Sequence, residues 1–143
     1  MLVQAIMHTD PATVDRDHTA LKVARLMKDR GVGSVIVVDE KGRPVGVITD
    51  RDLAVKLLPE GRDADTPVDV IMSHPVFAVS RNALIFDTLR EMARRHVHRM
   101  PVIDDETKRL VGVVTAEDAL MLLTTELANI AEVMSSSRTP RGA

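Results

Sequence analysis

Residues Gly46 to Asp52 read GVITDRD, and residues Gly112 to Asp118 read GVVTAED. In each stretch a glycine follows an apolar run, a threonine comes three residues later, and an aspartate three residues after that. The β-branched letters are typical of a buried strand, and Thr-x-x-Asp is typical of a helix N-terminus. The two stretches therefore predict a strand that leads directly into a helix, twice in one chain.

The rest of the sequence repeats in the same way. A shift of 65 residues aligns eleven identical pairs between positions 3 and 39, and a shift of 66 aligns seven more between positions 43 and 57. The slip of one residue falls where DEKGR faces DDETKR, as a turn of variable length would produce. We interpret this as an internal duplication, with repeats at 1–62 and 63–124 and a final segment at 125–143.

Each repeat predicts the same order of elements. A short helical turn ending in Ile-Met comes first, and in the second repeat Thr66 would cap it with Pro67 at its first helical position. An extended piece, a helix that Gly31 ends in the first repeat, two strands and a closing helix follow. Apolar residues at helical spacing predict the buried faces of the two longer helices: Leu21, Ala24 and Met27 in the first, Ile85, Leu89 and Met92 in the second.

The closing helix of the second repeat is longer than one repeat needs. Its apolar stripe predicts a second packing surface, with a partner subunit as a candidate occupant. The last nine residues, SSSRTPRGA, have the composition of a disordered tail. The stripe comprises Leu120, Leu123, Leu127, Ile130, Ala131 and Met134.

Composition excludes several classes of function. The 143 residues carry a net charge of −2 and include no cysteine, which excludes disulfides, a catalytic thiol and thiolate metal sites. Two phenylalanines, Phe77 and Phe86, are the whole aromatic content; this predicts an aliphatic, methionine-filled core and argues against nucleic-acid binding by base stacking. No apolar run reaches the length of a membrane span, and we expect a cytoplasmic protein without membrane insertion.

The Thr-x-x-Asp pairs have two interpretations that can hold together. As a capping box, the threonine hydroxyl accepts a backbone N–H while the aspartate reaches back to the cap residue. As a ligand site, a carboxylate in the first helical turn can accept the hydroxyls of a ribose, and the threonine with nearby N–H groups can receive a phosphate.

The segment HVHRMPVID, residues 96–104, leaves three alternatives open. If the strand extends through it, His96 and His98 share a face and suggest a metal site, for which His8 and His74 are the remaining candidate ligands. It could equally be a solvated loop before a strand, or an anion site in which His98 and Arg99 donate to a phosphate. No phosphate-binding glycine loop and no nucleophile with a base partner is present, so we expect no catalytic residues.

The ordered set IMHTDPATV and IMSHPVFAV, VIVVD and MPVID, GVITDRD and GVVTAED resembles the tandem cystathionine-beta-synthase-type (CBS) domain pair, or Bateman module, over residues 2 to about 124. The resemblance implies an α/β (α+β) fold of two β-α-β-β-α units packed about a pseudo-twofold axis, with two clefts between them. Such modules commonly bind AMP, ADP, ATP or S-adenosylmethionine, and sometimes NAD. No metal or catalytic cofactor is implied.

Carried onto this sequence, the resemblance implies two unequal clefts. In the second, Gly33 and Ser34 stand where the first has a histidine and an arginine, and they offer no cation for a phosphate. The first cleft would combine Thr49, Asp52 and Val47 with His98, Arg99 and the base-facing segment with Val76, Phe77 and Val79. The second would combine Thr115, Asp118 and Val113 with Thr13, Val14, Gly33 and Ser34.

The function implied is a non-enzymatic sensor that binds an adenosine ligand and transmits the bound state to a separate effector protein. The alternative is a structural dimerisation module with degenerate, ligand-free clefts. Because members of this family usually pair into a disc of four units, a homodimer is expected in either case.

Overall fold

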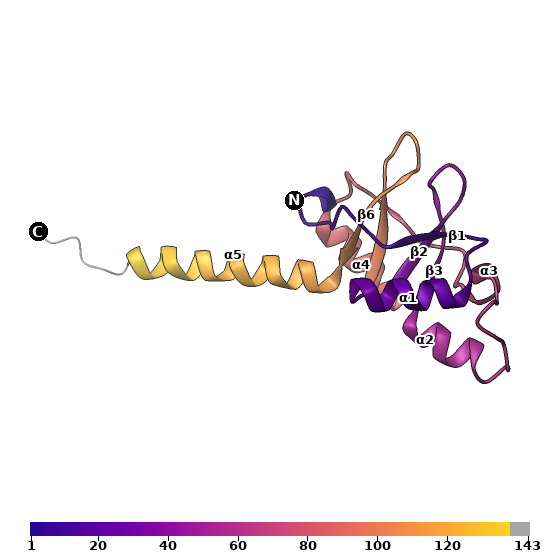
Figure 1. Ribbon diagram of the computed structural model, residues 1–143. Coiled ribbons are helices and arrows are strands. Elements are labelled where there is room, and N and C mark those ends of the chain that lie inside the picture. Colours follow the sequence, from indigo (N-terminus) through magenta and orange to yellow (C-terminus); the bar gives the residue numbers. More distant parts are fainter. Residues whose placement is uncertain (138–143) are drawn as a thin grey trace, which may run out of the picture.

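The computed structural model describes residues 1–137 and contains two three-stranded sheets, each with its own helices (Figure 1). The predicted tail begins at 135, but Ser135 to Ser137 are the last residues of a helix; the rest of the tail lies outside the described residues. The predicted order of elements in each repeat, and the α/β fold class, are confirmed.

The first lobe is built on one three-stranded sheet. The elements of this lobe are β1 (Thr13–Asp15), α1 (Ala20–Arg30), β2 (Ser34–Val38), β3 (Pro44–Thr49), α2 (Asp50–Asp52) and η2 (Leu53–Leu57). The sheet has the order β1-β2-β3, in which β1 runs parallel to β2 and β2 is antiparallel to β3. The helix that follows β3 begins as the α-helix α2 and continues as a π-helical turn, η2.

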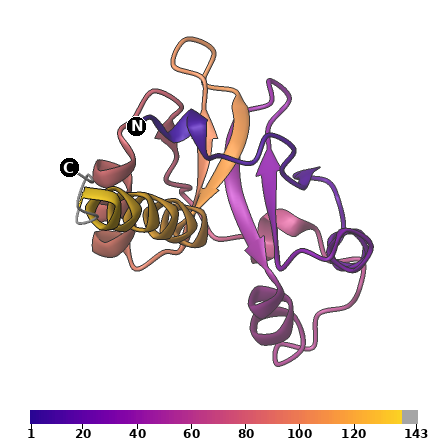
Figure 2. The ribbon, with the colours of Figure 1, turned by 90° about the vertical axis from the view of Figure 1, so that its left-hand side faces the viewer.

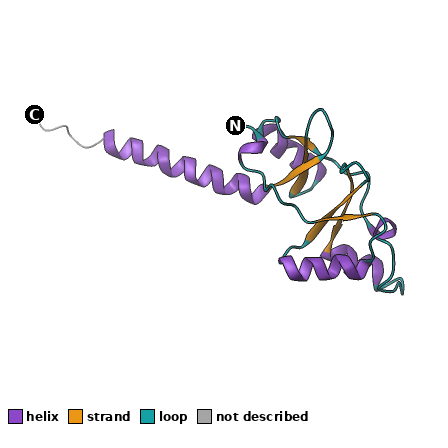
Figure 3. Cartoon of the chain, turned by 45° about the horizontal axis from the view of Figure 1, so that its top comes forward, coloured by secondary structure: helices purple, strands orange, loops and turns teal. Residues whose placement is uncertain are grey.

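The second lobe repeats this topology. The elements of the second lobe are β4 (Val79–Ser80), α4 (Ile85–Arg95), β5 (Arg99–Ile103), β6 (Leu110–Thr115) and α5 (Ala116–Ser137), and its sheet has the order β4-β5-β6. Two short helices, η1 (Val3–Ala5) and α3 (Val68–Ile71), complete the fold. The two sheets lie side by side in the middle of the molecule, with the helices outside them (Figures 2 and 3).

The two repeats exchange their first helical turns. Val3 of η1 is fully buried in the core of the second lobe, where its N–H donates to the carbonyl of Ala83 at 2.8 Å. In return, Val68 and Ile71 of α3 are buried in the core of the first lobe. Each lobe therefore contains residues of both repeats, and the two repeats cannot separate without opening both cores.

The helix α1 ends at Gly31, as the sequence predicts, but buries a different face. The Thr19 hydroxyl accepts the Lys22 N–H at the N-terminus, and Gly31 takes the left-handed conformation at the C-terminus, with φ 63°. Ala20, Val23 and Met27 are buried, whereas the predicted Leu21 and Ala24 are exposed. On α4 the prediction holds: Ile85 and Met92 are buried and Leu89 packs against them.

Two smaller expectations are corrected or confirmed. Pro67 is the residue before α3 rather than its first helical residue, and Thr66 does not cap the helix. Instead, the Thr66 hydroxyl donates to the carbonyl of Asp63 at 2.8 Å, because the chain is still turning there.

The core is aliphatic with methionine, as predicted, and Phe77 and Phe86 are 46% and 60% exposed.

Both β-hairpins are closed by an aspartate at an equivalent position. Asp39 accepts the backbone N–H groups of Lys41 and Arg43, and the Arg43 side chain lies 2.8 Å from its other oxygen. These bonds, the Arg43 backbone N–H first, lower the pKa of Asp39. The backbone N–H of Thr107 does the same for the pKa of Asp104, its counterpart in the second lobe.

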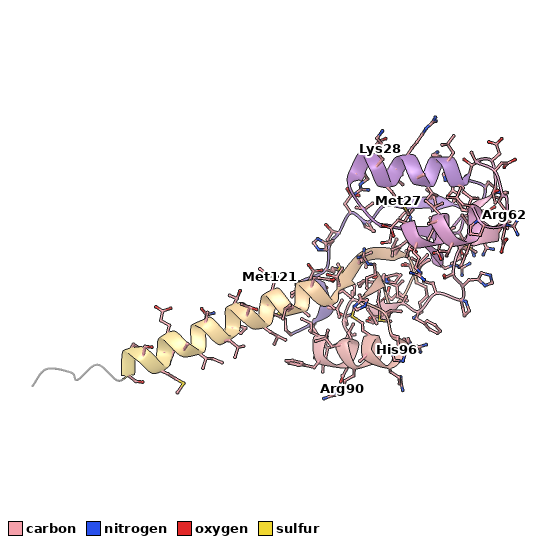
Figure 4. The ribbon with its side chains drawn as sticks, turned by 90° about the horizontal axis from the view of Figure 1, so that it is seen from below. Met27, Lys28, Arg62, Arg90, His96 and Met121 are labelled. Carbon is pink, nitrogen blue, oxygen red and sulfur yellow. The ribbon has the colours of Figure 1, made fainter. Side chains whose placement is uncertain are left out.

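The helix α5 extends well beyond the second lobe (Figures 1 and 4). Side chains from Met121 onward project from it on several sides, and Leu127, Ile130 and Met134 of the predicted stripe are 67%, 56% and 55% exposed. None of the helices within residues 1–137 combines the length and apolarity needed to cross a membrane.

Candidate ligand-binding cleft

A cavity of about 480 Å³ lies between the two sheets. This volume is in the range of pockets that hold small molecules. Residues of both lobes line it: Ser34, Ile36, Val47, Thr49, Ser73, Pro75, Val76, Phe77, Val97, His98, Arg99, Met100, Pro101, Val113 and Glu117.

Most of the residues expected in the first cleft meet in this cavity, but two do not line it. Asp52 lies one helical turn behind Thr49, and Val79 packs against the core of the second lobe. Ser34 and Val113, which the resemblance assigns to the second cleft, line this cavity instead. The residues that meet here as expected are Val47, Thr49, Val76, Phe77, His98 and Arg99.

Asp52 forms the expected capping box with Thr49. The Thr49 hydroxyl accepts the Asp52 N–H at 3.1 Å, and the Asp52 carboxylate accepts the Thr49 N–H at 2.9 Å. The other carboxylate oxygen lies 3.1 Å from Nζ of Lys56, which also reaches the Ser73 hydroxyl. A carboxylate has about four acceptor positions, so Asp52 keeps acceptor capacity for a ribose beside its structural bonds.

The second repeat has the same capping box, but a different side chain contacts its aspartate. Asp118 accepts the Thr115 N–H at 3.2 Å and bonds the Thr115 hydroxyl at 2.7 Å. Its other oxygen lies 2.9 Å from Nε2 of His8. His8 corresponds to Ser73 in the repeat alignment. The backbone of His8 pairs with Val113 and that of Ser73 pairs with Val47, in each case two residues before the threonine of the capping box. The imidazole of His8 therefore contacts one carboxylate oxygen of Asp118, the residue that the resemblance assigns to ribose binding in the second cleft.

The remaining second-cleft candidates do not gather into the cavity between the sheets. Val14 pairs with Val37 in the sheet and is buried in the core of the first lobe, because its strand turns this side chain inward. Thr13, its neighbour, is exposed. Gly33 lies beside Asp50, whose carboxylate oxygen would be 3.2 Å from a Cβ added there.

His96 and His98 precede the strand and are not part of it. The strand β5 begins at Arg99, and His96 takes a left-handed conformation, φ 55°, at the end of α4, at the position that Gly31 holds in the first repeat. The alternation that would pair His96 with His98 therefore does not apply. No three histidine, aspartate or glutamate side chains come together as a metal site within the described residues.

A side chain of the first lobe holds Arg99, and a side chain of the second lobe holds Phe77. The guanidinium of Arg99 donates to the Ser34 hydroxyl at 3.0 Å, so this contact joins the two lobes. The Arg95 guanidinium stacks over the Phe77 ring, 3.5 Å from its centroid, and also bonds Glu91. Bonds from Arg94 and then Arg95 lower the pKa of Glu91.

Sequence reasoning missed several lining residues. Ile36 and Pro101 occupy equivalent positions of the two repeats, so the internal symmetry itself could have identified them. Glu117 was also missed, although it aligns with Arg51 in a shared motif and reverses its charge.

Fold and cavity together define a class of protein: two homologous β-α-β-β-α units with a ligand-sized cavity between their sheets. The model of the CBS domain matches the chain twice, at residues 3–58 and 68–125, and the protein belongs to this family.

Known proteins agree with this assignment. The chain is 37% identical over 116 residues to the CBS domain-containing protein YhcV of Bacillus subtilis, covering 81% of each chain. It is 35% identical over 133 residues to protein MK0525 of Methanopyrus kandleri, covering 92% of this chain and 67% of that one. The solved CBS domain pair of protein MJ0100, in complex with 5′-methylthioadenosine and S-adenosylmethionine, superposes with a TM-score of 0.77 at 27% identity, covering 88% of this chain and 98% of that one.

Proposed function

We propose that this protein is a non-enzymatic sensor that binds an adenosine-containing small molecule in the cavity between its lobes and conveys the bound state to a separate effector protein. The observation that carries the proposal is that Thr49 of one repeat and Arg99 of the other line one cavity of ligand size. The adenosine ligands of the MJ0100 domain pair support the same ligand class.

The lining suggests how such a ligand would be held. Val47, Val76 and Phe77 offer apolar contacts for the base. Asp52 would accept ribose hydroxyls, and Thr49 and Arg99 would donate to the substituent at the 5′ carbon, with His98 beside them. The second cleft is the weaker candidate, because Gly33 and Ser34 offer no cation for a phosphate and the Ser34 hydroxyl already accepts a hydrogen bond from Arg99.

The arrangement also suggests how binding would be signalled. Arg99 and Ser34 join the lobes across the cavity, and a ligand between them would favour one relative position of the two sheets. A ligand shifts such an equilibrium only by its difference in affinity for the two arrangements. We further propose a cytoplasmic location, which the absence of cysteine supports.

We also propose a homodimer, in which α5 pairs with its counterpart in a second copy. Leu120, Leu127 and Met134 follow each other at intervals of seven residues, with Leu123 and Ile130 between them. Apolar residues at alternating intervals of three and four residues are typical of two helices that pack against each other as a coiled coil. The exposure of Leu127, Ile130 and Met134 in the single chain supports this use.

Replacing Asp52 with alanine tests the ligand site. We expect the affinity for the adenosine ligand to fall by about 1.5–3 kcal/mol, because the charged ribose hydrogen bonds are lost. Asp118→Ala is the matched control: it removes the same capping box, which costs each variant about 1 kcal/mol of folding stability, but in the other repeat. Thermal melts with AMP, ADP, ATP, S-adenosylmethionine and NAD identify the ligand, and titration calorimetry gives both affinities.

The outcomes separate the two functions. A ligand at about 100 times its dissociation constant adds about 2.7 kcal/mol to the stability. A melt that none of these compounds shifts at millimolar concentration, from protein whose denaturation releases no nucleotide, would support the structural dimerisation module. Equal losses in the Asp52 and Asp118 variants would reject the assignment of the ligand to the first cleft.

Replacing Arg99 with alanine tests the 5′ end of the cavity. We expect AMP to bind about tenfold more weakly while adenosine changes less than about twofold, because only AMP loses a charge-assisted bond. Arg90→Ala, which removes an exposed arginine outside the cavity, controls for net charge. An equal loss for AMP and adenosine would show that Arg99 shapes the cavity instead of binding phosphate.

A further inference from the structure

The cavity carries one carboxylate that the proposed binding scheme does not use. Of the residues that line it, only His98, Arg99 and Glu117 have titratable side chains. Glu117 is exposed and lies in the first turn of α5, directly after the strand that brings Val113 to the cavity. Within residues 1–137 it forms no salt bridge and no side-chain hydrogen bond, so its charge is available to act on a ligand.

The lining carries little positive charge. Among the described residues that line the cavity, Arg99 is the one permanently charged cation. Arg95 stacks on the lining residue Phe77 and Lys56 reaches the lining residue Ser73, but each already pairs with a carboxylate, Glu91 and Asp52 respectively. The lining charges of Arg99 and Glu117 cancel each other. A triphosphate brings about four negative charges and needs several cations or donors to replace its water. This lining supplies no such set.

We infer that Glu117 makes the cavity select adenosine compounds whose 5′ substituent is uncharged or positively charged, such as a thioether or a sulfonium, over 5′ polyphosphates. The inference rests on the adenosine site proposed above. It narrows the ligand class from the charge of the lining: a neutral substituent meets no repulsion, and a cationic one gains an ion pair with the carboxylate. Apolar residues such as Val97 and Met100 suit a substituent that carries little charge.

The equivalent position of the first repeat supports the role inferred for Glu117. Arg51 stands where the second repeat has Glu117, within the shared strand-to-helix motif. The capping box does not need this residue, since Thr115 and Asp118 form it alone. Either charge is therefore compatible with the fold, and the choice of glutamate can act on the ligand without disturbing the helix.

Calorimetric titration of the full chain with 5′-methylthioadenosine, S-adenosylmethionine, AMP and ATP tests the inference. We expect methylthioadenosine to bind at least about tenfold more tightly than ATP at low salt, where charges are least screened. Glu117→Gln should tighten ATP binding about three- to tenfold, weaken S-adenosylmethionine and leave methylthioadenosine unchanged. Glu126→Gln removes the same charge farther along α5, outside the cavity, and should change none of the affinities.

The results distinguish this inference from the function on which it rests. If the compounds bind, but ATP binds as tightly as methylthioadenosine or Glu117→Gln leaves their ratio unchanged, the role of Glu117 is rejected and the adenosine site stands. If none of the four compounds binds, both the site and the inference are rejected.

Discussion

Glutamate in place of both Leu127 and Ile130 should convert the proposed homodimer into a monomer. The helix α5 has 22 residues, and at 1.5 Å per residue it is about 33 Å long. Its apolar stripe repeats every three or four residues along this length, so two copies can pack side by side and bury the same residues on both helices. A single helix that leaves such a stripe in water gains little from folding, because most helical stability in proteins comes from packing.

The expected effect is large because each substitution would act on both copies of the proposed homodimer. Each buried leucine or isoleucine contributes about 1.5–3 kcal/mol, and each substitution acts twice, once in every copy. Burying an unpaired carboxylate costs further free energy. We therefore expect the dissociation constant to rise by at least about a hundredfold, which corresponds to about 2.7 kcal/mol.

Sedimentation or light scattering over a range of protein concentrations measures this change. Thr125→Glu with Asn129→Glu adds the same two charges to exposed positions on the other side of α5 and should leave the dimer intact. If the native chain is monomeric at high micromolar concentration, or if the Leu127 and Ile130 variant stays dimeric, α5 does not form the interface.

The sequence predicted the local elements well because hydrophobic periodicity is a local property. It could not predict the exchange of η1 and α3, since nothing near Val3 or Val68 in the sequence says which core will bury them. The buried face of α1 was wrong for a related reason. ALKVARLM offers two apolar faces one residue apart, and only contact with the sheet decides for Val23 over Ala24.

The candidate site was predicted in part for the same reason. Local motifs predict where a strand ends and a helix begins, as at Thr49. Which cavity a residue lines depends instead on how the two sheets pack together, and no local motif predicts that packing. Ser34 and Val113 therefore moved from the expected second cleft to the first. The side chain of Val14 lies in the core because alternate residues of a strand face opposite sides of the sheet. The sequence alone does not say which of these sides is the inner one.

Replacing Gly112 with alanine should be the most damaging small change to the fold. An added Cβ would lie 2.5 Å from the backbone oxygen of His8, closer than real contacts allow. His8 cannot retreat freely, because its backbone exchanges hydrogen bonds of 2.8 and 2.9 Å with Val113 and its side chain holds Asp118. The N-terminal segment would have to move away and give up these bonds.

Gly46 is the matched control, because it holds the same position in the first repeat. There the added Cβ would meet the Met72 side chain, with the sulfur at 2.4 Å, and no backbone atom is among its nearest neighbours. A methionine side chain can take another rotamer, so Gly46→Ala should cost about 1–2 kcal/mol. Gly112→Ala should cost about 3–5 kcal/mol, from overpacking plus the loss of two backbone hydrogen bonds.

Urea denaturation of the two variants measures both costs as changes in the free energy of unfolding. The difference between them isolates the backbone contact, since the residue change, the strand position and the following Val-x-Thr sequence are the same in both repeats. Equal losses would mean that the segment before His8 is free to shift. That result would in turn mean that His8 is not a fixed partner of Asp118.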